Sequence, residues 1–366
     1  MIRIQSFLKL MVDKNASDLH MRVGVTPVMR VDGELFRLNT EPVKTDEMEA
    51  IIQYLMNSEQ YDNYCRNHEL DFAIGVKGLG RFRINAYHQR GTPSFAIRYI
   101  KTTVPEFSKL LLPEVILDIA MRKRGLILVT GTTGSGKSTL LASMVEHINK
   151  NTSSNIVTIE DPIEFLYKDK RSIVAQREIG TDAGSFSSAL RASFRQDPDI
   201  ILIGEIRDSE TMETAMSAAD TGHLVMSTLH TMNTVETISR IISFFPPHQH
   251  DQIRLVLSSV LVSVISLRLL PRQGGGEGRV PAAEILVNNA NIAELIQQPH
   301  NTHILLQAIA DGNTQYGSQT FDQSLFQLYQ DELISLQTAK QYANNPDDFD
   351  LKVRGVQGTS DRSWMQ

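Results

Sequence analysis

The sequence is poor in cysteine, with Cys65 alone among 366 residues. One thiol can form neither an intramolecular disulfide nor a four-cysteine zinc site, so both are excluded. A basic excess is also missing, because 36 lysines and arginines face 42 acidic residues and leave a net charge of −6. This balance disfavours a dedicated nucleic-acid binder, which usually presents a basic face.

Long apolar runs are absent as well. The most apolar stretch, 255–267, lies between Arg254 and Arg268 and contains four serines. It falls short of the roughly 20 residues that a spanning helix needs. We therefore expect a buried core helix there and no transmembrane segment. The start of the chain is an amphipathic helix candidate interrupted by charge and does not resemble a signal peptide. Any membrane association would have to come through a partner.

The length predicts two or three domains of globular composition. Residues 1–100 have the pattern of an α+β module, and 101–113, with Pro105 and Pro113, that of a connection. In 114–290 strands alternate with helices, which predicts an α/β domain with a parallel sheet covered on both faces. Residues 291–354 indicate helices, and the polar end, 355–366, predicts disorder. The glycine-rich segment 274–278 is expected to form an exposed, mobile hairpin tip.

The element boundaries follow from apolar periodicity and turn residues. Expected strands are 27–31, 34–38, 71–76, 81–88, 94–99, 126–130, 155–159, 200–203, 223–229 and one near 281–287. Expected helices are 2–14, 48–56, 185–194, 209–220, 234–244, 291–298, 303–311, 323–329 and 336–343.

The most informative motif is Gly131–Ser138, a complete G-x-x-x-x-G-K-[ST] phosphate-binding loop. A bare match could be only a glycine-rich turn. Here an apolar strand precedes the loop and a helical pattern follows it, the arrangement that points backbone N–H groups at phosphate oxygens. Lys137 would reach the β- and γ-phosphates, and the hydroxyl of Ser138 would ligate magnesium. The predicted nucleotide-binding residues are Gly131, Thr133, Gly134, Ser135, Gly136, Lys137, Ser138 and Thr139.

Two acidic segments come next along the chain. Glu160, Asp161 and Glu164 follow one strand, and strand ends in such sheets face the nucleotide crevice. Hydrolysis needs a water-orienting base and an acid for magnesium, which these carboxylates could supply. A solvated acidic turn is the alternative. Glu205 follows the apolar run 200–203 and a glycine, which is the pattern of a Walker B strand. Its carboxylate would bind the metal or the water around it. An ordinary buried strand with an acidic cap is the alternative.

Two histidines bracket the strand 223–229. His230 lies at its carboxyl end, where an imidazole could sense the γ-phosphate. His223 lies at the other end and is expected to be structural or to lie at a subunit edge.

Together these segments resemble the boxes of secretion ATPases. The loop matches Walker A, Ile159–Glu164 the Asp box, Ile200–Glu205 Walker B and Thr221–His230 the His box. Within that superfamily the chain resembles the type IV pilus retraction ATPases, the PilT/PilU family. Segments 17–20, 80–85 and 89–91 match the smaller PAS-like N-terminal domain of that family. The resemblance implies an α/β, RecA-like ATPase core.

The resemblance also implies a cytoplasmic homohexamer that works with ATP and Mg²⁺ at the inner membrane. Its partners would be the pilus platform protein and a paralogous retraction ATPase, with no nucleic acid. Each site would lie between two subunits, and an arginine arriving in trans can be worth about 10³–10⁵ in rate. Candidates for that arginine are Arg81, Arg83 and Arg98, for which surface ion pairing is the alternative. The implied catalytic residues are Lys137, Glu164, Glu205 and His230, supported by Glu160, Asp161, Arg207 and His223.

The sequence distinguishes less clearly between the PilT and PilU members of the family. The retraction signature Ala-Ile-Arg-Asn-Leu-Ile-Arg-Glu corresponds to 291–298, where both arginines are replaced. This change, 319–329 and the longer tail favour a PilU-type paralogue, whereas Asp197 is PilT-like. Three other functions stay open: an assembly or type II secretion ATPase, a nucleic-acid motor, and a nucleotide-binding accessory subunit without independent ATPase activity.

Overall fold

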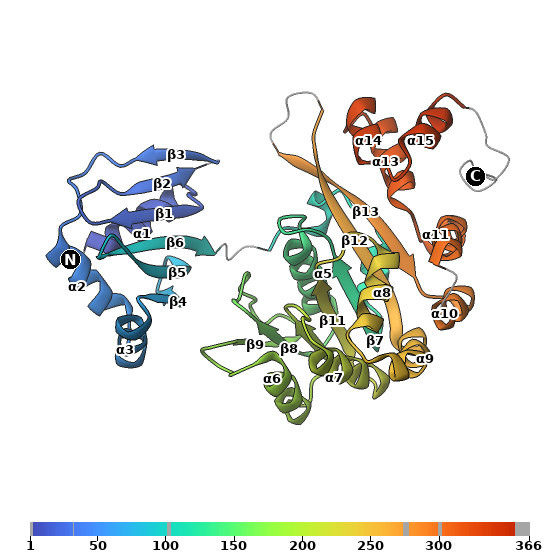
Figure 1. Ribbon diagram of the computed structural model, residues 1–366, viewed down its shortest axis with the longest axis horizontal. Coiled ribbons are helices and arrows are strands. Elements are labelled where there is room, and N and C mark those ends of the chain that lie inside the picture. Colours follow the sequence, from blue (N-terminus) through green and yellow to red (C-terminus); the bar gives the residue numbers. More distant parts are fainter. Residues whose placement is uncertain (1–2, 32, 101–103, 274–277, 299–301, 356–366) are drawn as a thin grey trace. The chain divides into compact units, whose positions relative to one another are not determined.

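The computed structural model describes residues 3–31, 33–100, 104–273, 278–298 and 302–355. The chain divides into two compact units, each described by itself below (Figure 1). One comprises Met1–Thr103 with Glu164–Leu166, and the other Val104–Ile163 with Tyr167–Gln366. The predicted hairpin tip and C-terminal tail fall, except for Gly278 and Gly355, outside the described residues.

The first unit is a six-stranded antiparallel sheet in the order β3-β2-β1-β6-β5-β4. Its helices are α1 (Arg3–Asp13), α2 (Thr45–Leu55) and α3 (Ser58–Asn67), and its strands are β1 (Asp18–Arg22), β2 (Val28–Val31), β3 (Glu34–Arg37), β4 (Glu69–Val76), β5 (Gly80–Gln89) and β6 (Thr92–Ile100). Apolar residues of α1 and α2 form one buried cluster with inward-facing residues such as Phe82 and Ile84. Because side chains alternate along a strand, Arg81 and Arg83 point to the other face.

Two elements of this unit were not predicted. β1 is short and alternates polar with apolar residues, so its pattern over five residues is weak. α3 has little apolar character, but Asn57 and Gln60 form a capping box at its start. Each side chain there accepts a hydrogen bond from the other residue's backbone N–H, which stabilises a helix that packing alone would not indicate.

The second unit is a seven-stranded sheet in the order β13-β12-β7-β11-β10-β8-β9. Its strands are β7 (Gly125–Thr130), β8 (Asn155–Glu160), β9 (Ile173–Glu178), β10 (Ile200–Ile203), β11 (Leu224–Leu229), β12 (Leu261–Pro271) and β13 (Arg279–Val287). Neighbours pair in parallel except for the antiparallel hairpin of β12 and β13. The α/β class predicted from the sequence is therefore confirmed, although β9 was not foreseen.

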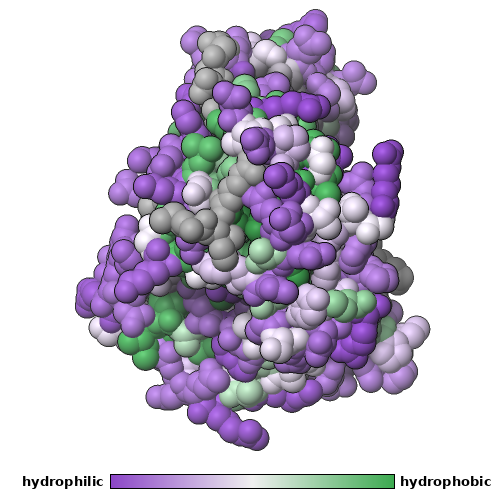
Figure 2. All heavy atoms as spheres, turned by 90° about the vertical axis from the view of Figure 1, so that its left-hand side faces the viewer, coloured by the Kyte–Doolittle hydropathy of each residue, from purple (hydrophilic) through white to green (hydrophobic). Residues whose placement is uncertain are grey.

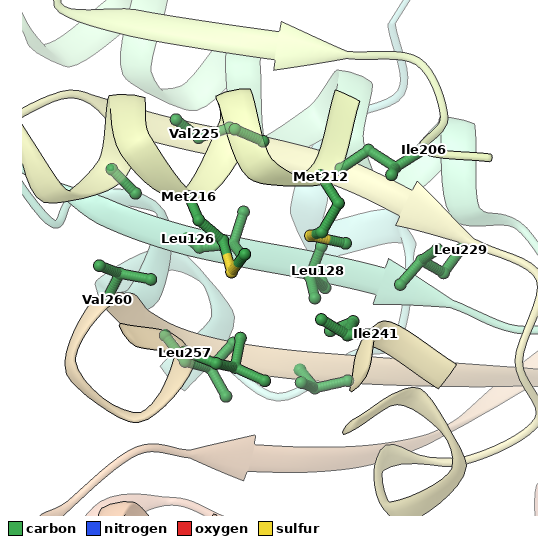
Figure 3. Close-up of a cluster of buried hydrophobic side chains, with 14 of the residues drawn as sticks. Leu126, Leu128, Ile206, Met212, Met216, Val225, Leu229, Ile241, Leu257 and Val260 are labelled. Carbon is green, nitrogen blue, oxygen red and sulfur yellow. The ribbon is translucent and has the colours of Figure 1, made fainter. Parts of the chain in front are cut away.

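Helices cover both faces of this sheet (Figure 1). One face packs on α4 (Val115–Ala120) and α5 (Lys137–Asn151). The other packs on α6 (Phe186–Ser193), α7 (Ser209–Asp220), α8 (Thr234–Ser243) and α9 (His250–Val260). In Figure 3, Met212 and Met216 of α7 point towards Leu126 and Leu128 of β7, the strand that carries the phosphate loop. The loop thus leaves a strand that is buried on both sides.

The buried helix predicted over 255–267 is only half correct. α9 ends at Val260, and the chain continues as β12 from Leu261. β12 pairs with both β7 and β13, so its backbone groups are satisfied by neighbouring strands. Val264 and Ile265 enter different apolar clusters on the two faces of the sheet. Tertiary pairing therefore decides the structure of a short apolar run that periodicity cannot assign.

The end of the described chain is helical, as expected. The helices are α10 (Ala290–Gln297), α11 (Thr302–Asp311), α12 (Asn313–Tyr316), α13 (Phe321–Gln330), α14 (Leu336–Tyr342) and α15 (Pro346–Val353). The last three pack on the β12–β13 hairpin through Leu270, Val280 and Ala282. No described helix is long and apolar enough to cross a membrane. Hydrophilic side chains dominate the face shown in Figure 2, with apolar ones in small groups.

Candidate nucleotide site

The phosphate loop joins β7 to α5. Gly131 and Gly136 have φ angles of 137° and 99°, a region that L side chains rarely adopt. Gly136 is the N-cap of α5 and offers no side-chain acceptor, whereas α7 and α8 are capped by Asp208 and Asn233. The first N–H groups of α5 therefore lack a capping oxygen and suit an anionic ligand.

Lys137 lies over this loop. Its side chain is buried, and its Nζ donates to the carbonyl oxygens of Gly131 at 2.7 Å and Thr132 at 3.1 Å. A Cβ built on Gly131 would lie 2.5 Å from both Leu267 O and Ser135 Oγ, so only glycine fits. The ammonium group is therefore held at the centre of the loop, where a phosphate would replace its carbonyl partners.

Glu205 and His230 come together beside the loop. β11 lies between β7 and β10, so the segments that follow β10 and β11 emerge at the same edge of the sheet. His230 Nε2 lies 3.5 Å from Glu205 Oε2, and Arg207 forms an ion pair with the same carboxylate. Donation of a hydrogen bond to the Glu205 carboxylate raises the pKa of Arg207 above its ordinary value. The structure thus brings these three predicted site residues together.

Gly204 brings the ends of β10 and β8 into close contact. A Cβ there would lie 3.3 Å from Glu160 Cα and from Ile159 O. Gly204 N also donates to Ile159 O at 2.7 Å. From the sequence we expected this glycine to let the backbone approach the cofactor, but the approach that the structure shows is between two strands.

The three carboxylates after β8 have different surroundings. Glu160 is buried, and its Oε1 accepts from Thr158 Oγ1 at 2.6 Å and Gln176 Nε2 at 3.1 Å. Gln176 belongs to β9, which lies on the opposite side of β8 from the loop strand. Glu160 is thus directed away from the phosphates, whereas Asp161 and Glu164 are exposed.

Sequence reasoning missed Glu178, the last residue of β9. It is buried, and its Oε2 accepts from the backbone N–H of Ile163 at 3.0 Å. Because Ile163 directly precedes Glu164, Glu178 fixes the turn that carries the candidate base. No sequence signal identified it, because β9 reads Ile-Val-Ala-Gln-Arg-Glu and does not alternate apolar with polar residues.

His223 lies far from this cluster. It precedes β11, whereas His230 follows it, so a strand of six residues, roughly 20 Å, separates them. Its Nδ1 lies 3.0 Å from Ala218 O, and its ring contacts Phe194. These local contacts agree with the structural role expected for it.

The three candidate arginines lie on one sheet face of the first unit. Arg83 and Arg98 are directly opposite in β5 and β6, and Arg81 is two residues from Arg83. Arg98 Nε lies 2.8 Å from Asp18 Oδ1, and Arg83 Nε 3.8 Å from an Asp71 oxygen.

Asp18 is the acidic partner of Arg98 on this sheet face. Burial works to raise its pKa, but hydrogen bonds from Ser17 and Arg98 outweigh it and hold the pKa below the ordinary value. The surface ion pairing weighed as the alternative is thus present for Arg83 and Arg98, and it leaves their charge on the sheet face.

The predicted magnesium ligands have suitable chemistry. Mg²⁺ takes one or two protein oxygens together with phosphate and water, not a cage of side chains. Ser138 in the first turn of α5 and Glu205 would supply a hydroxyl and a carboxylate. Within the described residues no group of three or more His, Cys, Asp or Glu side chains could hold a metal by itself.

Comparison with known proteins assigns the chain to a family. The model described as type II/IV secretion system protein matches residues 2–329. The chain belongs to this family. Among family members it is 39% identical to the type IV pilus ATPase PilU of Pseudomonas aeruginosa, over 96% of this chain and 92% of that protein. It is 41% identical to the type IV pilus retraction ATPase PilT of the same organism, over 94% and 99%.

Solved structures of the same family agree. The pilus retraction motor PilT with bound ADP has a TM-score of 0.87 and 44% identity, covering 94% of this chain and 98% of that one. The ATPase DotB of Legionella pneumophila has a TM-score of 0.77 and 26% identity, covering 93% and 95%. The resemblance to retraction ATPases stated from the motifs is therefore confirmed over nearly the full chain.

Proposed function

We propose that this protein is an ATPase that powers type IV pilus retraction. Two observations carry the proposal: Lys137 lies in a complete phosphate loop, and the Glu205–His230 pair follows β10 and β11, the two strands next to the loop strand β7 in the sheet. Relatives that are full-length matches and are named pilus retraction ATPases support the mechanical role. The chain is nearly equally identical to PilU and to PilT, so sequence identity does not favour either paralogue.

In the proposed mechanism the loop and Lys137 bind the phosphates, while Ser138 and Glu205 would hold Mg²⁺, which would supply positive charge to stabilise the phosphate groups. Glu164 accepts a proton from the attacking water as its oxygen bonds to phosphorus and the bond to the ADP oxygen breaks. Glu178 fixes the turn before Glu164.

Two further contacts would tune this site. Arg207 and His230 hold the Glu205 carboxylate in place. His230 is also placed to respond when the γ-phosphate leaves. Asp161, exposed at the end of β8, supports the acidic segment.

We also propose a cytoplasmic homohexamer docked on the platform protein at the inner membrane. The candidate arginines of the first unit, of which Arg98 is exposed, would complete the site of a neighbouring subunit. Mixed rings test this: Lys137→Ala subunits should restore turnover at the intact phosphate loops of Arg98→Gln subunits, because they supply Arg98 in trans. If mixed rings hydrolyse ATP no faster than the two variants measured separately, Arg98 does not act in trans.

The central experiment measures phosphate release and nucleotide affinity together. Lys137→Ala should lose both, and Glu164→Gln should bind ATP but lose turnover on the order of 10²–10⁴-fold, the usual worth of a general base. Ring assembly serves as the control for folding. A Glu164→Gln protein with wild-type turnover would exclude this residue as the base.

A nucleotide-binding accessory subunit is the second candidate. Its support is α10, where Ala293 and Gln297 replace the two arginines of the retraction signature, and Gln297 Nε2 instead donates to Ser258 Oγ at 2.9 Å. ATP binding without phosphate release by the pure protein would favour it. Loss of pilus retraction in a deletion strain, rescued only by a turnover-competent chain, would favour the motor.

A further inference from the structure

Glu284 is a fully buried carboxylate far along the chain from the motifs above. It lies within β13 and has a relative exposure of 0%. Burying such a group is unfavourable unless hydrogen bonds compensate. Its Oε1 accepts two of them from one residue, at 2.8 Å from Thr234 N and 2.8 Å from Thr234 Oγ1. Oε1 therefore binds the first residue of α8, whereas the buried Oε2 has no hydrogen-bond partner within the described residues.

The segment that Glu284 holds leads directly to the nucleotide site. Thr234 comes four residues after His230. Between them, Thr231 Oγ1 lies 2.7 Å from Thr237 Oγ1, and Met232 N donates to Glu236 at 2.8 Å. These bonds join the turn to the first part of α8, so displacement of Thr234 would also displace His230.

The register of the sheet shows where this attachment lies. Glu284 is opposite Ser266, Ser266 is opposite Thr130, and Thr130 is opposite Leu229. Ser266 Oγ and Thr130 Oγ1 are 2.7 Å apart. Thr130 is the residue before the phosphate loop, and Leu229 is the residue before His230. Glu284 thus binds α8 at the same height in the sheet at which the phosphate loop and the His230 segment begin.

Apolar packing does not by itself determine where along the sheet α8 begins. Ile241 of α8 points into the cluster that contains Leu128 and Leu257 (Figure 3). Contacts of this kind are non-directional, whereas the two bonds to Glu284 are directional. A carboxylate at a helix N-terminus is also favoured by the helix dipole. The bonds therefore fix where along the sheet α8 begins.

We propose that Glu284 is a positioning residue for ATP hydrolysis: it holds the start of α8 so that His230 stays in contact with Glu205. This inference rests on the proposed function. Glu284 does not touch the reacting atoms and acts through Thr234. Its effect should fall on turnover and not on nucleotide binding, because the loop and Lys137 make their contacts without it.

The test compares three variants by kcat, KM for ATP and amide hydrogen exchange in residues 230–237. Glu284→Ala removes both acceptor bonds. Glu284→Gln keeps an amide oxygen at the Oε1 position and removes only the charge. Ser263→Ala is the control, since Ser263 is a buried residue of β12 whose Oγ donates to Leu286 O at 2.7 Å but which contacts neither Thr234 nor the site.

Glu284→Ala should lower kcat on the order of 10–100-fold, as expected for misplacement of about 1 Å, with KM nearly unchanged and faster exchange in 230–237. Glu284→Gln should restore both, and Ser263→Ala should change neither. Wild-type kcat in folded Glu284→Ala, or equal losses in Glu284→Gln and Glu284→Ala, would overturn the proposal.

A variant that does not fold and a wild type without turnover can be distinguished from failure of the positioning role. If Glu284→Ala does not fold, Thr234→Val keeps the N–H bond and removes the hydroxyl bond, and an unchanged kcat and exchange rate there would refute the positioning role. If the wild-type protein shows no turnover, the proposed function fails. The exchange of 230–237 then decides the positioning role alone, with unchanged exchange in Glu284→Ala refuting it.

Discussion

Replacing Gly204 by alanine inserts a methyl group between the ends of β10 and β8. The new carbon would lie 3.3 Å from Glu160 Cα and Ile159 O, both backbone atoms that cannot rotate away. Carbon atoms in favourable contact are about 3.5–4.0 Å apart, so the strands must separate by a few tenths of an ångström. The hydrogen bond from Gly204 N to Ile159 O joins the same two strands and would lengthen.

The expected cost follows from this small separation. Overpacking in a core costs about 1–3 kcal/mol, and a shift this small belongs near the lower end, about 1–2 kcal/mol. For a domain of this size the unfolding midpoint should fall by roughly 2–8 °C. Turnover should fall on the order of 10–100-fold, because Asp161 at the end of β8 moves relative to Glu205. ADP affinity should stay within about twofold, since β11 separates β10 from the loop strand.

The assay measures phosphate release, ADP binding and thermal unfolding on the same preparation. Gly184→Ala is the matched control, because a Cβ there would meet nothing within 4 Å and would change none of the three. Wild-type turnover and midpoint in Gly204→Ala would show that the space between the strands does not limit the site. A loss of ADP affinity as large as the loss of turnover would show that the two parts of the site are not separable.

Three other predictions concern single side chains. Gly131→Ala should abolish ADP binding in a fluorescence titration, because the new carbon would lie 2.5 Å from a backbone carbonyl, and wild-type affinity would contradict this. The pKa of Asp18 is lowered, so its stabilisation is present above the unfolded value of about 3.9 and is lost as pH falls; the unfolding midpoints of the wild type and Asp18→Asn should converge below about pH 4. Burial raises the pKa of Glu284, so the wild type should lose stability relative to Glu284→Gln as pH rises above about 4.5, and a difference independent of pH would contradict this.

Local patterns predicted the loop, the acidic strands and His230 because each is a short segment whose chemistry depends on residue type and spacing. The phosphate loop needs a glycine where φ is positive and a lysine at its end, and both can be recognised within eight residues. The α/β class followed in the same way from alternating strands and helices.

The remaining features depend on pairing between distant segments. β12 looked like the continuation of a helix because its partners, β7 and β13, are not evident from local sequence. Glu178 and Glu284 act on Ile163 and Thr234, which are 15 and 50 residues away along the chain. A buried carboxylate in a strand has no sequence pattern of its own, and only the packing of distant segments reveals its partner.

The order of the strands also suggests why one site can hold nucleotide while hydrolysis is switched. The predicted phosphate contacts lie at the end of β7, whereas the candidate base follows β8, three positions further along the sheet. Glu205 and His230 follow the two strands between them and contact each other, so in the proposed site they would join the binding part to the hydrolytic part. A shift of β8 or of α8 would then change turnover without releasing ATP. A motor requires this separation, because a subunit that lost its nucleotide whenever hydrolysis was blocked could not wait for its neighbour.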